Sequence, residues 1–328
     1  MQILEKKSKK TFVSKLTAKR ENTWDRIFLS YKFFCLLFLI SAVFLTSCKS
    51  ESSSVVNQTP NAREVIDDFG RRVSLPNKIE RAVSLAPNLT EIAFAVGGGD
   101  KLVGVTSFCD YPLEARKIQK IGDTLTPNIE SIIALKPQIV LVSTASQIEN
   151  FTKILDEQQI SYFVTNPNSL EDIYQSIYKI GQIFSSDDRA DEVVKELKIR
   201  VAKVENRAND GKNTKVFLQI SNESLYTIGK ESFLTDLIVL AGGISVTEAV
   251  ATAYPKISLE TALAYQPEAI ILSDSEDNRE PHTVFRNSPA VKNGRIFKIN
   301  ADLLSRPGPR IVDALEQIAK ALHPESFE

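Results

Sequence analysis

Histidine and tryptophan are nearly absent from this chain of 328 residues. It contains two histidines, His282 and His323, and one tryptophan, Trp24. Zinc and manganese sites usually combine several histidines with carboxylates, and a Ser-His-Asp hydrolase needs one well-positioned histidine. Two scattered histidines without a motif around them supply neither arrangement. The sequence therefore argues against a protein that captures a metal ion directly and against a hydrolase of that type.

A long uncharged apolar run occurs near the start of the chain, in residues 33–46 (FFCLLFLISAVFLT). As a helix these fourteen residues would rise about 21 Å, short of a membrane span of roughly 20 residues. Basic residues precede the run and small residues follow it, which is the layout of a secretory signal. Its end, Leu45-Thr46-Ser47-Cys48, resembles the lipobox of bacterial lipoproteins, in which the cysteine is lipidated. We expect export and a lipid anchor at Cys48; the alternative is a short membrane anchor with an incidental cysteine.

Cysteine is also scarce, with three residues in the whole chain. Cys35 lies in the leader and Cys48 would carry the lipid, so Cys109 would remain alone. An exported protein commonly contains disulfides, but this one would have none within its chain. Because a nucleophilic cysteine needs a histidine partner, we expect Cys109 to be a small buried residue.

The formal net charge of -1 hides an uneven distribution. Residues 1–47 hold nine of the 40 basic side chains and three of the 41 acidic ones. The body that follows therefore carries 31 basic and 38 acidic side chains, a net charge of -7. A basic leader on an acidic body argues against nucleic acid as the main partner.

Strands and helices are expected to alternate along the body after an N-terminal hairpin over residues 63–76. Apolar strands bracketed by helices are typical of parallel sheets covered on both faces. The expected strands are residues 81–85, 102–106, 138–142, 161–165, 215–220, 269–272 and 296–299. The expected helices are residues 88–96, 128–136, 151–158, 170–184, 232–240, 258–265 and 310–322.

One longer segment, residues 187–208, interrupts this alternation. Its apolar residues form a single stripe at helical spacing, namely Ala190, Val193, Val194, Leu197, Val201 and Val204. A helix of this length would be a rod of about 33 Å. We therefore expect an α/β fold with two lobes, each built on a central, mainly parallel sheet, bridged by a single long α-helix.

The domain boundaries follow from these segments. We expect a signal peptide over residues 1–47 and a lipid-anchored flexible tether, rich in Ser, Asn and Gln, over residues 48–62. The N-terminal α/β lobe would span 63–185, the bridging helix 186–210, and the C-terminal α/β lobe 211–328.

An internal repeat supports the division into two lobes. Residues 130–141 (ESIIALKPQIVL) pair with residues 260–271 (ETALAYQPEAII). In both, a Glu in the first helical turn precedes a Pro by seven residues, and a buried strand follows. An acid at a helix N-terminus is favourable by only about 0.3–1 kcal/mol, so stability alone could account for each. We nevertheless expect Glu130 and Glu260 to occupy equivalent positions in the two lobes.

Several segments of the body resemble the cobalamin-binding proteins of bacterial ABC importers, a group within the long-helix-bridged class that also includes siderophore and haem binders. The matching segments are residues 84–91 (SLAPNLTE), 102–112 (LVGVTSFCDYP), 128–137, 216–219, 229–232, 254–260 and 305–310 (SRPGPR). Together they cover about residues 63 to 324. The Asp-Tyr-Pro and Arg-Pro-Gly-Pro-Arg segments point more towards corrinoids than the broader motifs do.

The resemblance implies an extracytoplasmic, lipid-anchored, monomeric substrate-binding protein that captures a corrinoid between its lobes and breaks no bond. It also implies that Glu130 and Glu260 meet arginines on the two subunits of the permease. The corrinoid would be transported cargo, and no cofactor is implied. The ligand-binding positions that it implies are Phe108, Tyr111, Tyr226, Tyr254, Asp302 and Arg306.

Two departures from the family pattern bear on the ligand. Thr124 and Ser143 stand near positions where the best-known members place tryptophans, and a cleft without tryptophan loses large flat contact area. The alternative is the same fold binding haem or an iron siderophore, with Tyr111 or Tyr254 available as an axial ligand for haem.

An enzyme is the third hypothesis. Gly97-Gly98-Gly99 is a weak candidate for a phosphate loop, because it lacks the Lys-Ser/Thr of a P-loop and follows a helix. We expect these glycines to close the helix instead.

Overall fold

The computed structural model describes residues 62–144, 148–208 and 213–328 of the chain. The expected signal peptide, most of the tether and the candidate lipidation site Cys48 lie outside these residues. The chain divides into two compact units, Met1–Gln58 and Thr59–Glu328, and the second contains all the residues that the structure describes. No helix within the described part is both long enough and apolar enough to cross a membrane.

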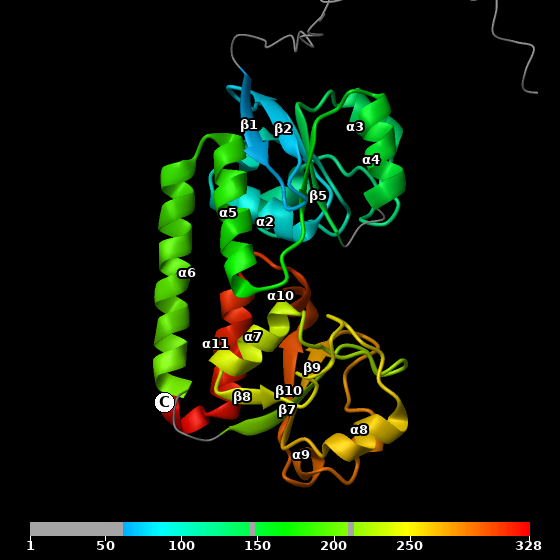
Figure 1. The fold of residues 1–328 in the computed structure, drawn as a ribbon, viewed down its shortest axis with the longest axis vertical. Helices are drawn as coiled ribbons and strands as arrows, with labels where there is room; N and C mark the ends of the chain where they lie inside the picture. The colour runs from blue at the N-terminus through cyan, green and yellow to red at the C-terminus, as the bar shows by residue number, and fades with distance from the viewer. Residues whose placement is uncertain (1–61, 145–147, 209–212) are drawn as a thin grey trace, which may run out of the picture. The chain divides into compact units, whose positions relative to one another are not determined.

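The N-terminal lobe contains a hairpin and a parallel sheet (Figure 1). The hairpin strands β1 (Ala62–Ile66) and β2 (Arg72–Pro76) pair antiparallel around a turn at Gly70, whose φ of 75° favours glycine. The sheet has the strand order β4-β3-β5-β6, all parallel. Its strands are β3 (Ala82–Ser84), β4 (Leu102–Val105), β5 (Ile139–Ser143) and β6 (Tyr162–Thr165). The helices are α2 (Pro87–Ala95), α3 (Ile129–Ala134), α4 (Ile148–Glu157) and α5 (Leu170–Phe184), with short 3-10 turns at Gly99–Lys101 and Leu113–Lys117.

The C-terminal lobe repeats this arrangement. Its parallel sheet has the order β10-β9-β7-β8, which is the order of the first lobe when the strands of each lobe are counted from its own first strand. The strands are β7 (Thr214–Gln219), β8 (Gly243–Ser245), β9 (Ala269–Asp274) and β10 (Ile296–Asn300). The helices are α7 (Phe233–Leu240), α8 (Leu259–Tyr265), α9 (Pro289–Lys292), α10 (Ala301–Ser305) and α11 (Ile311–Leu322), with 3-10 turns at Thr283–Phe285 and Pro324–Ser326.

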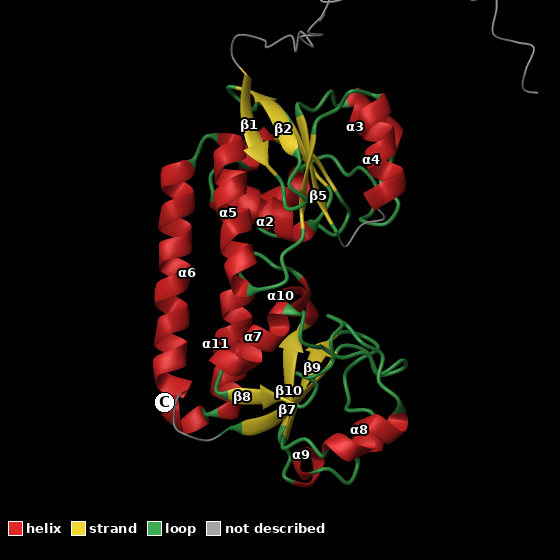
Figure 2. Ribbon diagram, in the orientation of Figure 1, coloured by secondary structure: helices red, strands yellow, loops and turns green. Residues whose placement is uncertain are grey.

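A single helix, α6 (Asp187–Ala208), connects the lobes. The ribbon view in Figure 2 shows it running alongside α5 in one lobe and α11 in the other. The apolar stripe of α6 is buried against these helices, whereas Ile199 on its outer surface is 61% exposed. The expected α/β fold with two parallel sheets and one bridging helix is confirmed, and the 3.6-residue spacing of the stripe explains why the sequence predicts this helix well.

Both sheets are covered on both faces, which agrees with their continuous apolar strands. One buried cluster fills the inner faces of both lobes and continues from α2 and α5 through α6 to α7 and α11. Two smaller clusters fill the outer faces, one beneath α3 and α4 and one beneath α8 and α9. The shared inner cluster joins the lobes through packed side chains as well as through the connecting chain.

Several short elements lie outside the sequence prediction, among them α9, the 3-10 turns, β8 and α10. Residues after Gly242 form the short strand β8 at the sheet edge. Residues after Asn300 form the one-turn helix α10, and the Asn300 side chain caps it by accepting a hydrogen bond from the backbone N–H of Asp302. Each is too short to show a period. The three glycines at 97–99 close α2, with Gly97 at a φ of 83°, as expected for a helix end rather than a phosphate loop.

Candidate functional site

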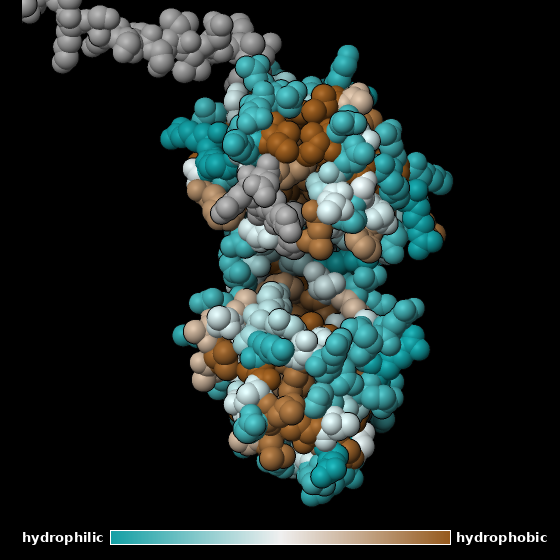
Figure 3. All heavy atoms as spheres, turned by 90° about the vertical axis from the view of Figure 1, so that its right-hand side faces the viewer, coloured by the Kyte–Doolittle hydropathy of each residue, from teal (hydrophilic) through white to brown (hydrophobic). Residues whose placement is uncertain are grey.

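A cleft of about 720 Å³ lies between the two lobes. It is bordered by the carboxyl ends of strands from both parallel sheets: Ser143 ends β5, Asn166 follows β6, and Ser273 lies near the end of β9. Ligands of open parallel sheets bind in the crevice at this end of the strands. The space-filling view in Figure 3 shows a hollow between the lobes on the face opposite α6. The fold therefore directs loop residues of both lobes into one binding space.

Exposed aromatic rings surround the cleft from both lobes. Phe108, after β4, is 59% exposed, and on the other lobe Tyr226 and Tyr254 are 41% and 48% exposed. Each of the three lines the cleft, and Phe233 adds a buried ring behind them. Large apolar side chains that converge on a hollow while still exposed are typical of a ligand-binding surface.

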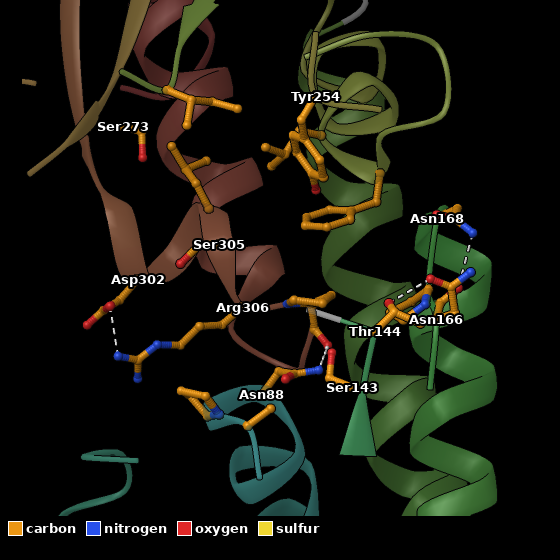
Figure 4. A pocket seen from close by; sticks show the side chains of 18 of the residues that line it. Asn88, Ser143, Thr144, Asn166, Asn168, Tyr254, Ser273, Asp302, Ser305 and Arg306 are labelled. Carbon is orange, nitrogen blue, oxygen red and sulfur yellow. Dashed lines mark hydrogen bonds and ion pairs between the residues drawn. The ribbon is translucent and has the colours of Figure 1, made fainter. Parts of the chain in front are cut away.

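Tyr254 is a neutral phenol at physiological pH. Withdrawal of its hydroxyl from water raises the pKa of Tyr254, while a hydrogen bond with Ser232 acts in the opposite direction without cancelling it. The Tyr254 side chain points into the cleft in Figure 4. It can therefore offer a flat ring and a hydroxyl to a ligand, and the tyrosinate form is disfavoured.

Asp302 and Arg306 form an ion pair at the edge of the cleft, with 2.7 Å between Oδ1 and Nη2 (Figure 4). They lie one helical turn apart, on α10 and just after it, so local geometry favours the pair. Arg306 also pairs with two acidic side chains outside α10. Its Nη1 also lies 2.7 Å from Asp110 and 3.2 Å from Glu91, both on the other lobe.

Glu91 is the buried centre of this inter-lobe cluster of charges. It lies on α2 with its side chain 1% exposed. Arg310 binds it in a bidentate manner, donating from Nε to Oε2 over 2.9 Å and from Nη2 to Oε1 over 2.5 Å. A planar guanidinium matches a carboxylate in this way, which fixes the orientation of both. The hydrogen bonds that Arg310 donates to Glu91 accordingly raise the pKa of Arg310.

Asp110 is held ionised by the same cluster. Burial alone would raise the pKa of Asp110, but the hydrogen bond and positive charge of Arg306 outweigh it and lower that pKa below its ordinary value. The Asp-Tyr-Pro and Arg-Pro-Gly-Pro-Arg segments, which lie far apart in the sequence, thus meet between the lobes.

Five of the six ligand-binding positions expected from the sequence line the cleft, namely Phe108, Tyr226, Tyr254, Asp302 and Arg306. Tyr111 is not among the described lining residues, and its ring instead lies under the guanidinium of Arg310, 4.0 Å from the ring centroid to Cζ. Thr124 and Ser143, where the family pattern has tryptophans, both line the cleft.

One wall of the cleft is formed by polar residues that were not predicted from the sequence. Thr144, Asn166 and Asn168 lie together on the N-terminal lobe, after β5 and β6. The available signal was positional: small polar residues directly after two buried, neighbouring parallel strands. Glu91 was also missed, because its arginine partners lie 215 and 219 positions away in the chain.

Glu130 and Glu260 lie away from the cleft lining and occupy matching places in the two lobes. Each is the second residue of a short helix, α3 or α8, and each is exposed. The residue before each helix caps it, since Asn128 accepts from the N–H of Ser131 and Ser258 from that of Thr261. The pKa of Glu260 is lowered by hydrogen bonds from its own backbone and from Ser258. The repeat in the sequence therefore corresponds to a repeat in space.

The residues considered for other chemistry lie apart from the cleft. Cys109 is fully buried, with its sulfur 3.2 Å from Thr90 Oγ1 and 3.1 Å from Thr106 Oγ1. His282 accepts a hydrogen bond at Nδ1 from the N–H of Val284 and starts a 3-10 turn. Within the described ranges no group of three or more His, Cys, Asp or Glu side chains is arranged to hold a metal ion.

Comparison with known proteins gives a consistent family match. Residues 83–303 match the family described as "Periplasmic binding protein". An uncharacterised ABC transporter substrate-binding lipoprotein, YvrC of Bacillus subtilis, is 30% identical over 306 residues, which cover 88% of this chain and 96% of that protein. A vitamin B12-binding protein of Vibrio vulnificus is 29% identical over 251 residues, covering 74% of this chain and 89% of that protein.

A solved structure shows the same similarity. The periplasmic vitamin B12 binding protein BtuF of Vibrio cholerae superposes with a TM-score of 0.65 at 27% sequence identity. The match covers 76% of this chain and 98% of that structure. The matched part is larger than either lobe alone, so the similarity concerns both lobes.

Proposed function

Since this chain belongs to the periplasmic binding protein family, we propose that it captures a corrinoid in its inter-lobe cleft and delivers it to an ABC importer. The observation that carries this proposal is the set of exposed rings of Phe108, Tyr226 and Tyr254, which face one cleft from both lobes. Flat rings on two sides suit a large planar macrocycle, and the open cleft lets the rest of the ligand protrude into solvent. The vitamin B12-binding relatives support the same ligand class.

Haem and iron siderophores are the alternative cargo, and the lining of the cleft favours haem less than a corrinoid. Haem binding usually needs a histidine or tyrosinate axial ligand. No histidine belongs to the described lining, and the raised pKa of Tyr254 disfavours its ionised form. Tyr111, the second tyrosine considered for this role, stacks on Arg310 instead.

The chemistry of the site in this proposal is binding and release, without bond breaking. The cleft offers rings, amides, hydroxyls and paired charges, while the one cysteine of the described body, Cys109, is buried beneath Thr90 and Thr106. No cofactor is part of this proposal, because the corrinoid is the cargo.

Glu130 and Glu260 are proposed to dock the loaded protein on the permease. Their matched positions on α3 and α8 suit a dimeric permease that offers one arginine pocket from each subunit. Exposed acid–arginine pairs are individually weak, but two on a rigid body set the register and act together.

Lipidation at Cys48, which lies outside the described residues, is proposed to tether a monomeric body to the outer face of the cell membrane. The Leu45-Thr46-Ser47-Cys48 motif supports this, as does a relative that is named a lipoprotein. The acidic body then works in the extracytoplasmic space.

A colour-retention assay tests the choice of cargo. Purified protein is mixed with cyanocobalamin at micromolar concentration, desalted and scanned for corrin absorbance; haemin and a ferric siderophore are run in parallel. We expect corrin absorbance to elute with the protein. A colourless protein that instead retains haemin or the siderophore would replace the corrinoid proposal with the alternative.

The docking proposal has its own prediction. The double variant Glu130→Ala/Glu260→Ala should bind cyanocobalamin as the unmodified protein does and should support no corrinoid uptake in cells, because the ligand cleft is untouched while both contacts to the permease are lost. The matched control is Glu192→Ala/Glu205→Ala, which removes two acids from the exposed side of α6. Uptake that survives the first pair of substitutions would remove these residues from the docking site.

A further inference from the structure

Thr124 and Tyr254 occupy equivalent positions in the two lobes. Each lies six residues before the glutamate of the internal repeat, Glu130 in one lobe and Glu260 in the other. Both line the cleft, Thr124 from the N-terminal lobe and Tyr254 from the C-terminal lobe. The same place in the repeat therefore carries an aromatic ring on one side of the cleft and a small hydroxylated side chain on the other.

The two walls of the cleft differ in the same way around these residues. The aromatic residues of the C-terminal lobe that line the cleft are Tyr226, Phe233 and Tyr254. Among the described lining residues the N-terminal lobe contributes one ring, that of Phe108 after the edge strand β4. The rest of its wall includes three small residues that we call the recess, namely Thr124, Ser143 and Thr144. A flat macrocycle that lies on the C-terminal rings would thus turn its other face towards the recess.

The loop that carries Thr124 is held in shape by its own hydrogen bonds. Asp123 Oδ1 accepts from the N–H of Leu125 over 2.8 Å and from that of Thr126 over 2.6 Å. Asp123 Oδ2 accepts from the Thr126 hydroxyl over 2.9 Å. Gly122 has a φ of 94°, and a Cβ there would lie 2.7 Å from the Thr126 carbonyl oxygen. Because these contacts form within the protein, the depth of the cleft in front of Thr124 does not depend on a bound ligand.

A substituent that stands perpendicular to a macrocycle needs depth on one side of the cleft. The upper axial ligand of a corrinoid is such a group, and its size ranges from a methyl group to a whole nucleoside. A ring at position 124, matching that of Tyr254, would fill this depth, and forcing extra atoms into a filled space is unfavourable. The small side chain of Thr124 leaves the depth open.

We propose that Thr124 is a specificity-determining residue, and that the recess lets the cleft accept a corrinoid whose upper axial ligand is as large as a nucleoside. This inference rests on the proposed corrinoid function and adds to it the form of the cargo that is taken. The two equivalent positions then have different roles. Tyr254 contacts one face of the macrocycle, whereas Thr124 leaves room for the group on the opposite face.

The test compares adenosylcobalamin with methylcobalamin, which share the corrin ring and its side chains and differ in the size of the upper axial ligand. Affinities are measured by equilibrium dialysis in the dark for the unmodified protein and for Thr124→Tyr, which copies the residue of the other lobe. We expect the unmodified protein to bind the two cobalamins within about threefold of each other. In Thr124→Tyr, adenosylcobalamin should bind at least about tenfold more weakly than methylcobalamin, because the new ring fills the recess.

The matched control is Leu125→Tyr, which adds the same ring at the next residue, an exposed position outside the described lining, and should keep the ratio of the unmodified protein. If Thr124→Tyr does not fold, Thr124→Leu makes the same comparison with a smaller side chain. A larger preference of the unmodified protein for methylcobalamin, or an unchanged ratio in the Thr124 variant, overturns the inference while leaving the corrinoid function in place. Failure to bind either cobalamin would instead count against the corrinoid function itself.

Discussion

At the scale of the residue, the side chain that most closely joins the two lobes is Glu91. Its carboxylate is almost completely buried and contacts both Arg306 and Arg310 from the opposite lobe. A buried ion pair need not stabilise a protein relative to apolar residues, but removing one partner leaves the other charge uncompensated. The cluster therefore makes the relative position of the lobes sensitive to one carboxylate.

Substitution of Glu91→Gln should destabilise the protein by roughly 3 kcal/mol, since Arg310 loses its buried carboxylate and Arg306 loses one of three. Urea unfolding of both proteins measures the difference. Glu192→Gln, which touches only the exposed pair with Arg189, should leave the unfolding midpoint unchanged. Equal midpoints for Glu91→Gln and the unmodified protein would show that the cluster does not hold the lobes.

Asp110 gives a pH dependence with a definite sign. Because Arg306 lowers the folded-state pKa of Asp110, its contribution to stability is present above the unfolded-state pKa of about 3.9 and is lost as the pH falls through the lower folded value. The unfolding free energy of the unmodified protein should therefore fall below about pH 4. Asp110→Asn should be less stable at pH 7 and should show a shallower fall below about pH 4. Parallel curves for the two proteins would refute this assignment.

At the scale of the element, the short loops after the strands supply the site. The loop of residues 250–254 carries Tyr254 and lies directly against Gly229, whose N–H donates to the Ala253 carbonyl over 2.9 Å. A Cβ at Gly229 would lie 2.1 Å from the Thr252 carbonyl oxygen and 2.6 Å from that of Val250. Backbone atoms cannot rotate away as a flexible side chain can, so this glycine sets the distance between the two segments.

Gly229→Ala should cost about 1–3 kcal/mol and should weaken ligand binding, because the loop that positions Tyr254 must shift. Thermal unfolding and a cyanocobalamin titration measure the two effects. Ala251→Ser, an exposed change in the same loop, serves as the control and should alter neither. Full affinity in Gly229→Ala would mean that the position of Tyr254 is not important for binding.

The sequence predicts long or periodic elements well and the contacts between them poorly. The stripe of α6 and the repeated helix–Pro–strand pattern containing Glu130 and Glu260 are local signals, and the structure contains both. Strand β8 and helix α10 are too short for a period, so they were not expected. Glu91 and Arg310 both belong to segments that resemble the family. Their pairing depends on how two distant segments meet in space, which no local residue spacing predicts.

At the scale of the whole molecule, two similar α/β lobes share a continuous buried cluster and enclose one cleft at the carboxyl ends of their sheets. α6 packs on both lobes, and the charge cluster around Glu91 links them a second time. In the proposed function, the aromatic rings that line the cleft from both lobes bind the ligand.

Capture of a corrinoid by the aromatic rings is tested by a difference-absorbance titration of cyanocobalamin into the purified protein and into the double variant Tyr226→Ala/Tyr254→Ala. Ile199→Ser, on the outer face of α6, is the matched surface control. Removal of two aromatic side chains that line a cleft is expected to cost at least tenfold in affinity. We expect saturation at one corrinoid per chain for the unmodified protein and the control, with binding at least tenfold weaker in the double variant. Absence of saturable binding in the unmodified protein, or equal affinity in the double variant, would contradict it.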